Sequence, residues 1–165
     1  MTHRAASPLT RFQLDVARLF FELAESDGFL LAGGAALAAQ GLSERPTQDL
    51  DLFTSPHHGS VPAAVAALEA AAHGRGWSVT RVRGADTFAR LLVHGDSEEV
   101  LVDLAMDSTP QRPPLMSIAG PALDPEELAG RKLVALFDRA EPETSSTSRC
   151  SPSDSARPDS SNWPP

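Results

Sequence analysis

Two aspartates separated by a single residue, Asp49 and Asp51, are the side chains of this sequence best suited to bind a metal ion. They belong to an alternating Asp-Leu-Asp-Leu segment, which has the period of a half-buried strand. Successive side chains of a strand point to opposite faces, so both carboxylates project from one face, about 7 Å apart. Their oxygens are the hard ligands that Mg²⁺ prefers. An isolated Asp-x-Asp is more often a solvated strand face, so the surrounding residues decide.

A pair of glycines, Gly33 and Gly34, follows the short apolar run 29–32 and precedes the segment 35–40. The run is expected to form a buried strand, and the segment a short helix. A turn without side chains lets backbone N–H groups approach a phosphate closely, and a helix N-terminus favours the negative charge. The alternative is an ordinary strand-to-helix turn.

A third carboxylate, Asp103, stands between Val102 and Leu104 in an otherwise apolar strand. An unpaired carboxylate in such a place costs free energy, so Asp103 is expected to be paired or to bind a metal. Three carboxylates that converge on two metal ions suit in-line phosphoryl or nucleotidyl transfer.

The elements that must position these residues alternate between helical and strand-like patterns. Thr10 and Gln13 have capping-box spacing at the start of an amphipathic helix, and Asp124 followed by Pro125 begins another. The apolar side of this last helix is expected to comprise Leu128, Leu133, Val134, Leu136 and Phe137. Ser60 is expected to cap a helix that ends at 74–76, and five strands are expected at 29–32, 49–54, 77–83, 87–94 and 100–105. Together they indicate an α/β (α+β) domain over 1–140 with a mixed sheet and flanking helices.

Composition bounds the class of protein. The chain has 165 residues and a net charge of −8, which argues weakly against a dedicated duplex-DNA binder but not against an enzyme that acts on nucleotides. No apolar run is long enough to span a membrane, no signal-peptide pattern is present, and Cys150 is the single cysteine. A cytoplasmic protein is expected.

The first motif resembles that of the AbiEii-type nucleotidyltransferases. It comprises Gly33-Gly34-x-Ala36-Leu37, followed by Arg45-x-Thr47-x-Asp49-Leu50-Asp51-Leu52. These are the toxins of type IV toxin–antitoxin and abortive-infection systems, within the polymerase-β-like nucleotidyltransferase superfamily. Asp103 falls where the superfamily places its third carboxylate. The segment from Glu127 to Lys132, and on to Arg139, is similar to the family's next motif.

The resemblance implies a role for each matching residue. Asp49, Asp51 and Asp103 would be catalytic and would hold two Mg²⁺ ions, with Asp103 also acting as the base. Gly33, Gly34 and Lys132 would bind the nucleotide, although Lys132 on an amphipathic helix is equally well explained as a solvated side chain. Arg45 and Thr47 would position the carboxylate strand.

The segment 141–165 departs from the family pattern. It contains eight serines and five prolines and is expected to be disordered. Relatives have an Arg-Asp-x-x-Asp motif at this distance from the lysine. Codons for residues 141–148 exist that, read in another frame, give Ala-Arg-Asp-Phe-Val-Asp-Val. We therefore expect the tail to be out of frame through a one-base deletion near codon 142, and catalysis to be impaired.

The family implies transfer of a nucleotide from an NTP to an acceptor, which in related mycobacterial toxins is a tRNA 3′ end, and a cognate antitoxin as partner. The arginines that could line an RNA surface are Arg75, Arg81, Arg83 and Arg90. Two alternatives remain. One is a minimal nucleotidyltransferase antitoxin that modifies a partner protein, which would normally carry Gly-Ser in place of Gly33-Gly34. The other is a non-catalytic remnant that only binds nucleotide.

Overall fold

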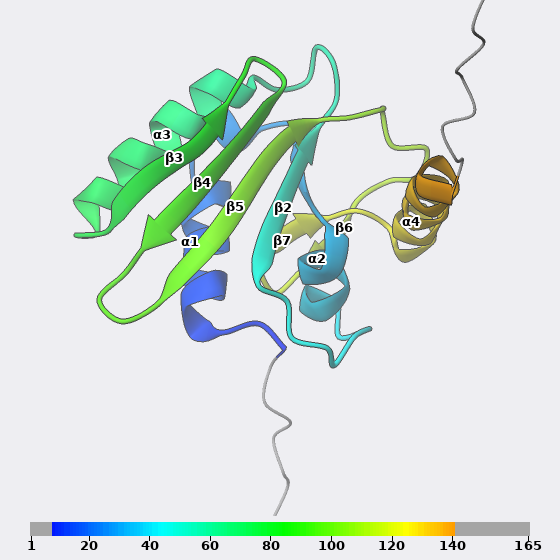
Figure 1. Cartoon of the computed structure of the whole chain (residues 1–165), viewed down its shortest axis with the longest axis horizontal. Helices are drawn as coiled ribbons and strands as arrows, with labels where there is room; N and C mark the ends of the chain where they lie inside the picture. The colour runs from blue at the N-terminus through cyan, green and yellow to red at the C-terminus, as the bar shows by residue number, and fades with distance from the viewer. Residues whose placement is uncertain (1–7, 141–165) are drawn as a thin grey trace, which may run out of the picture.

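A seven-stranded mixed sheet, in the order β3-β4-β5-β2-β1-β7-β6, forms the centre of the molecule (Figure 1). The structure is a computed structural model that describes residues 8–140, so the expected tail lies outside the described residues. The strands are β1 (Phe29–Ala32), β2 (Asp49–Thr54), β3 (Ser78–Gly84), β4 (Phe88–His94), β5 (Glu99–Met106), β6 (Leu115–Ser117) and β7 (Gly120–Ala122). The helices are α1 (Arg11–Phe21), the 3₁₀ turn η1 (Ala24–Ser26), α2 (Gly33–Ala39), α3 (Val61–Gly74) and α4 (Pro125–Ala140).

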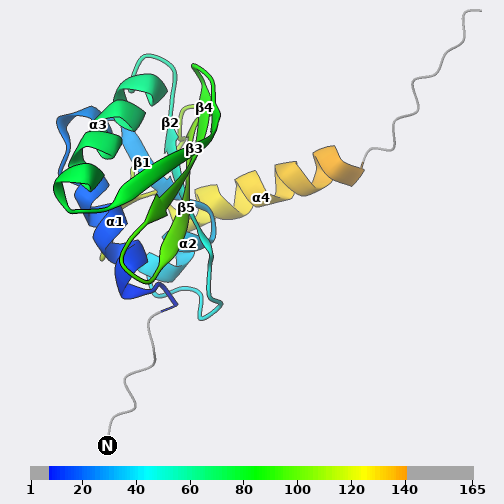
Figure 2. The ribbon, with the colours of Figure 1, turned by 60° about the vertical axis from the view of Figure 1, so that its left-hand side comes forward.

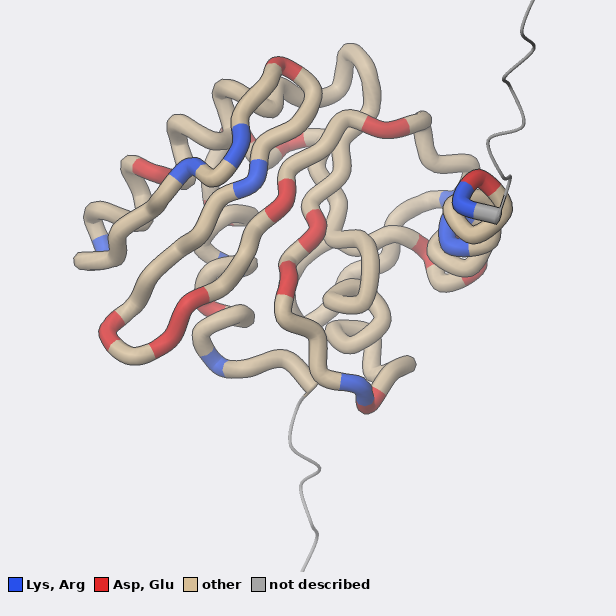
Figure 3. Tube along the Cα trace, in the orientation of Figure 1, with Lys and Arg blue, Asp and Glu red and all other residues tan. Residues whose placement is uncertain are grey.

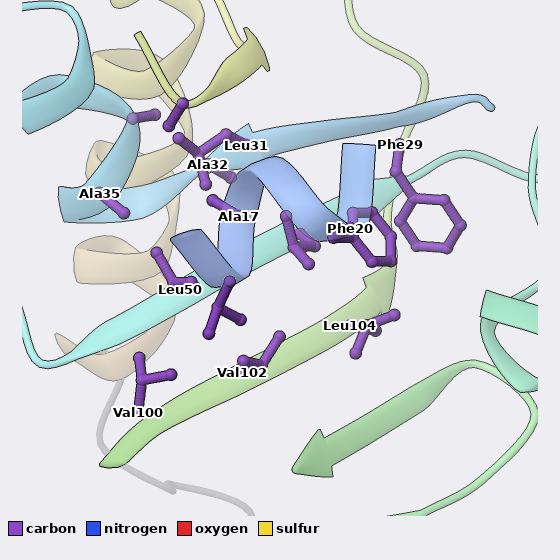
Figure 4. Packing of buried hydrophobic residues seen from close by; sticks show 14 of the residues in the cluster. Ala17, Phe20, Phe29, Leu31, Ala32, Ala35, Leu50, Val100, Val102 and Leu104 are labelled. Carbon is purple, nitrogen blue, oxygen red and sulfur yellow. The ribbon is translucent and has the colours of Figure 1, made fainter. Parts of the chain in front are cut away.

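Helices α1 and α3 cover one face of the sheet, as the rotated view shows (Figure 2). The predicted capping box begins α1: the Thr10 hydroxyl accepts from the Gln13 backbone N–H, and the Gln13 side chain accepts from the Thr10 N–H. Figure 4 shows Leu50, Val102 and Leu104 of the sheet beneath Ala17 and Phe20 of α1. These five side chains are buried, so the hydrophobic effect fixes which face of β2 and β5 turns inward.

All five predicted strands are present within one or two residues of their expected bounds. The sheet has two further strands, β6 and β7, which the sequence analysis did not predict. Each is three residues long, and β7 contains Pro121, which lacks an N–H and normally argues against a strand. They form because β7 pairs in parallel with β1, at Leu31 and Ala122, and β6 pairs with β7.

Helix α4 packs against the body of the protein only near its start. Asp124 caps it as predicted, because its carboxylate accepts from the N–H groups of Glu126 and Glu127. The expectation that Leu133, Val134, Leu136 and Phe137 form a buried side is wrong: these side chains are 54–72% exposed. Leu128 is the buried member of the expected set. Figure 2 shows why, since α4 projects away from the sheet after its first turns.

Ion pairs fasten the first turns of α4 to the loop that follows β5. The Arg131 guanidinium lies 2.6 Å from the carboxylate of Asp107 in the loop, and 3.2 Å from that of Glu127 within α4 itself. Arg112, in the same loop, pairs with Glu126. A hollow of about 650 Å³ remains between this loop and the helix, bordered by Val134 and Ala135. No helix of the described chain is long and apolar enough to cross a membrane.

Candidate active site

The three predicted carboxylates lie on one face of two adjacent strands. Strand β2 runs parallel to β5, and the register places Asp51 directly opposite Asp103. Asp49 lies two residues before Asp51, on the face that alternates with buried Leu50 and Leu52. The sheet register therefore brings together residues that are about fifty positions apart in the chain. Figure 3 shows the acidic segments of β2 and β5 side by side.

Asp103 is paired, as its place in an apolar strand predicted. Both of its oxygens accept hydrogen bonds from Arg90 on the adjacent strand β4, at 2.8 Å from Nε and 2.6 Å from Nη2. The bidentate geometry is the strongest that a guanidinium and a carboxylate can form. The hydrogen bonds and the charge of Asp103 raise the pKa of Arg90 above its usual value, so this cation stays protonated.

The charged form of the Asp51 carboxylate is disfavoured by its surroundings. Burial of its carboxyl group, followed by the nearby charges of Asp103 and Asp49, raises the pKa of Asp51 from 3.8 to about 6, and Arg90 opposes the shift. Burial disfavours the charged form, and like charges do the same. A positive charge bound beside Asp51 would relieve both effects.

The glycine pair lies against the carboxylate strand. Both glycines are in the first turn of α2, which begins at Gly33 and not at residue 35 as expected. Gly33 has a φ of +61°, and a Cβ at this position would lie 2.0 Å from the Asp51 carboxylate oxygen Oδ2. Any other residue would therefore displace the Asp51 side chain as well as strain the backbone. A Cβ on Gly34 would lie 3.3 Å from the Thr47 hydroxyl.

Thr47 connects three elements around the start of β2. Its hydroxyl donates to the Asp49 carbonyl over 3.3 Å, and its own carbonyl accepts from the Gln13 side-chain amide over 2.7 Å. Gln13 thus caps α1 and holds the segment that leads into the carboxylate strand. This second role was missed, because a capping-box residue carries no sequence signal for a contact thirty-four positions away.

The structure does not bring the remaining predicted residues to the carboxylates. Arg45 is exposed in the segment between α2 and β2, where its backbone N–H donates to the Ser43 hydroxyl. Lys132 is exposed on α4, one residue beyond the Arg131 that fastens this helix. Within residues 8–140 no ion pair joins Lys132 to Asp49, Asp51 or Asp103.

The carboxylate oxygens of Asp49, Asp51 and Asp103 are suitable ligands for a hard divalent cation, but the three side chains do not converge on one point. Among the described residues no three acidic, histidine or cysteine side chains are grouped closely enough to hold a metal ion. Asp103 instead faces Arg90. Asp49 and Asp51 offer half-buried carboxylates on one face of β2. Burial, and after it the charges of Asp103 and Asp49, raises the pKa of Asp51, and a bound cation would oppose both effects.

Arg90 is the charged residue at this site that the sequence analysis did not assign to it. It was considered only with Arg75, Arg81 and Arg83 as part of an RNA surface. These four do not form one surface, because Arg81 pairs with Glu69 of α3, on the opposite face from Asp103. The sequence indicated Arg90 only indirectly, because a carboxylate in an apolar strand such as that of Asp103 needs a partner.

The family follows from the sequence match. The family described as nucleotidyl transferase AbiEii toxin, type IV toxin–antitoxin system, matches residues 16–149. The chain belongs to the AbiEii family. The matched range includes all three carboxylates, both glycines and Lys132, so the predicted membership is confirmed. A search of curated proteins by sequence finds no significant match.

Solved structures share the fold of this AbiEii member at low sequence identity. The JHP933 protein of Helicobacter pylori is 17% identical, with a TM-score of 0.56 over 82% of this chain and 62% of its own. MenT4, a nucleotidyltransferase toxin of Mycobacterium tuberculosis, is 18% identical, with a TM-score of 0.54 over 75% of this chain and 50% of its own. The chain thus spans between half and two thirds of these proteins. The similarity confirms the α/β nucleotidyltransferase fold predicted from the sequence.

Proposed function

We propose that the protein is a metal-dependent nucleotidyltransferase that moves a nucleotide from an NTP to an acceptor, as the toxin of a toxin–antitoxin pair. The observation that carries this proposal is the register of β2 against β5, which sets Asp51 opposite Asp103 with Asp49 on the same face. Family membership supplies the reaction class. An RNA acceptor such as a tRNA 3′ end, a cognate antitoxin and a cytoplasmic location are parts of the same proposal.

Asp49 and Asp51 would hold Mg²⁺, with Asp103 as a third ligand. The ions would supply Lewis-acid stabilisation of the charge on the transferred phosphoryl group. In the reaction, a hydroxyl oxygen of the acceptor forms a bond to the α-phosphorus of the NTP. The bond from that phosphorus to the bridging oxygen breaks, and pyrophosphate leaves with the electron pair. Asp103 takes the proton of the attacking hydroxyl.

The neighbouring residues would position these groups. Gly33 leaves room for the Asp51 carboxylate beside the start of α2, and Gly34 leaves room for the Thr47 hydroxyl. Gly34 would also let the backbone N–H groups of that turn approach phosphate oxygens. Thr47 fixes the backbone of Asp49 through its hydroxyl, and Arg45 precedes it in the same segment. Lys132 would neutralise a phosphate, which requires α4 to carry it toward the carboxylates.

The experiment is a transfer assay with each of the four labelled NTPs, total tRNA and Mg²⁺. The expected result is incorporation that requires Mg²⁺ and is abolished in the Asp49→Asn, Asp51→Asn double variant. Binding of Mg²⁺ and NTP by a folded protein without any transfer would instead support a non-catalytic nucleotide-binding protein. Label transferred to a partner protein added in place of tRNA, with none on RNA in the first assay, would support the antitoxin alternative.

A second arm tests whether the segment after residue 140 impairs catalysis. The composition of 141–165 and the motif in the alternative reading frame motivate this part of the proposal. A gene with the frame restored at codon 142 is expected to give a more active protein. Equal activity of the two proteins, or a DNA sequence that lacks the motif in the other frame, would contradict it.

A further inference from the structure

Four charged residues form one row across the open face of the sheet. The register places Arg83 of β3 opposite Arg90 of β4, Arg90 opposite Asp103 of β5, and Asp103 opposite Asp51 of β2. Residues that oppose each other on adjacent strands project from the same face, and adjacent strands are about 4.8 Å apart. The row therefore passes from two cations to two carboxylates, with Arg90 and Asp103 in contact at its centre.

A β-bulge brings Arg83 into this row. The pairing of β3 with β4 is regular as far as Arg81, which lies opposite Leu91, and then shifts, so that Arg83 lies opposite Arg90. Without the extra residue, Val82 would lie opposite Arg90 and Arg83 would turn toward the face that α3 covers. Bulges are a common means of re-aiming a side chain beside a functional site. The Arg83 guanidinium also lies 5.7 Å from the centre of the Phe88 ring.

The contact between Arg90 and Asp103 conflicts with a metal ion on Asp103. Both oxygens of this carboxylate accept from the guanidinium, and its side chain is 11% exposed. A divalent cation bound there would lie beside a second positive charge, and the two would repel each other. The Arg90 side chain is 43% exposed, so it has room to move away from Asp103.

We propose that Asp103 exchanges Arg90 for a divalent cation when substrate binds, and that the released Arg90, together with Arg83, binds a phosphate group of the substrate. A guanidinium binds a phosphate with the same two-pronged geometry that it uses for a carboxylate, so Arg90 loses one partner and gains an equivalent one. Metal and phosphate then bind cooperatively, because each removes the partner that competes with the other. This inference rests on the proposed metal-dependent transfer.

The first test measures binding of Mn²⁺ alone, by calorimetry and by electron paramagnetic resonance. Arg90→Gln is expected to bind Mn²⁺ about tenfold more tightly than the parent protein, since the competing charged hydrogen bonds are gone. Arg90→Lys, which keeps the charge but not the two-pronged contact, is expected to lie between them. The matched control is Arg81→Gln, which removes an arginine–carboxylate pair from the other face of the sheet and should leave Mn²⁺ affinity unchanged. Thermal melts confirm that each variant is folded.

The possible outcomes distinguish failure of the proposed exchange from failure of the proposed metal-dependent function. If the parent protein binds Mn²⁺, Asp51→Asn loses it, and Arg90→Gln binds no more tightly, the exchange is refuted while the metal site stands. If neither the parent protein nor folded Arg90→Gln binds Mn²⁺, both the metal-dependent function and the exchange are refuted. An equal gain in Arg81→Gln would show a general charge effect and would also refute the exchange.

The second test measures binding of inorganic pyrophosphate in the presence of Mg²⁺. Arg83→Gln and Arg90→Gln are each expected to weaken it by about tenfold, as expected for a lost charged hydrogen bond. Arg83→Gln should leave Mn²⁺ affinity in the absence of pyrophosphate unchanged, because strand β4 with Arg90 lies between Arg83 and Asp103. Unchanged pyrophosphate affinity in both variants would refute the phosphate-binding part.

Discussion

Strand β2 and helix α4 both carry residues assigned to the site, but the protein holds them in different ways. Strand β2 is hydrogen-bonded to a neighbour on each side, and its Leu50 and Leu52 are almost completely buried. Helix α4 is fastened through Leu128 and the ion pairs of Arg131, and the apolar residues that follow are exposed. The carboxylates thus lie on a well-packed strand of the sheet, whereas Lys132 lies on a helix that is packed only near its start.

The difference shows what each kind of contact can specify. Burial of apolar side chains contributes most of the stability of a domain and also fixes which face of a strand is open. Two ion pairs that join α4 to the loop, Arg131 with Asp107 and Arg112 with Glu126, each include a carboxylate that is at least 43% exposed. Salt bridges open to solvent contribute about 0–1 kcal/mol each, so they position the helix only weakly. The arrangement of Asp49, Asp51 and Asp103 is therefore fixed by the sheet, whereas Lys132 lies on a part of α4 whose apolar side chains are exposed.

The largest effect on stability is expected when a buried side chain of the sheet is shortened. Leu104→Ala removes a fully buried side chain between β5 and α1, and should lower the free energy of unfolding by about 2–5 kcal/mol. The same change in α4, Leu136→Ala, should cost about 0.5 kcal/mol or less, because that side chain is 54% exposed. Urea denaturation of both variants measures the contrast. Similar losses would mean that α4 is as well packed as the sheet.

The next largest effect concerns the carboxylates. Asp49→Asn should reduce nucleotide transfer by about a hundredfold or more, because it removes a ligand of the proposed catalytic metal. Asp96→Asn, in the exposed turn between β4 and β5, is a suitable control with the same chemical change. Initial rates at saturating Mg²⁺ measure both. Full activity in folded Asp49→Asn would show that Asp49 does not contribute to catalysis.

The pH dependence of stability isolates Asp51. Its pKa is raised to about 6 in the folded protein, while the unfolded chain ionises near 3.8. The neutral carboxyl group is therefore compatible with the fold below pH 4, and its contribution to stability is lost as the pH rises through 6. Asp51→Asn does not titrate, so at pH 8 without metal it should be more stable than the parent protein by up to about 3 kcal/mol.

The measurement is chemical denaturation of the two proteins between pH 4 and pH 8. The stability difference should be small at pH 4 and should grow between pH 4 and pH 6. Mg²⁺ at pH 8 should stabilise the parent protein and leave Asp51→Asn unchanged. A difference that does not vary with pH would show that Asp51 is not under electrostatic strain.

A smaller effect is expected at Lys132. Lys132→Ala should reduce kcat/KM for the NTP by about tenfold if the side chain contacts a phosphate, as for one charged hydrogen bond. Arg11→Ala, which removes a cation that is 93% exposed at the start of α1, provides the control. Comparable small changes in both variants would show that Lys132 does not bind the nucleotide.

The smallest effect on stability is expected on the exposed face of α4. Replacing Leu133 and Phe137 together by glutamine should change the free energy of unfolding by about 0.5 kcal/mol or less, since both are surface side chains. The same change should reduce self-association, because contiguous exposed apolar residues favour it. Sedimentation velocity over a range of concentrations measures this. A large loss of stability would show that this face is covered in solution.

Much of this fold could be predicted because its signals are local. The capping box of α1, the Asp124 cap and the five longer strands follow from spacing within a few residues, and all are present. Strands β6 and β7 could not be predicted, because three-residue segments owe their conformation to the neighbour with which they pair. The buried side of α4 was predicted wrongly, since periodicity shows that a helix has an apolar face but not that anything packs against it.

The candidate site divides in the same way. The alternation Asp-Leu-Asp-Leu was sufficient to place Asp49 and Asp51 on one face, because the side-chain period of a strand is a local property of the backbone. The need of Asp103 for a partner also followed from its apolar neighbours in the sequence. Which residue meets that need depended on the register between strands, which sets Arg90 opposite Asp103 and, through the bulge after Arg81, sets Arg83 opposite Arg90. Register is a property of pairs of strands, set by the packing of whole faces, and so it is found in the folded molecule.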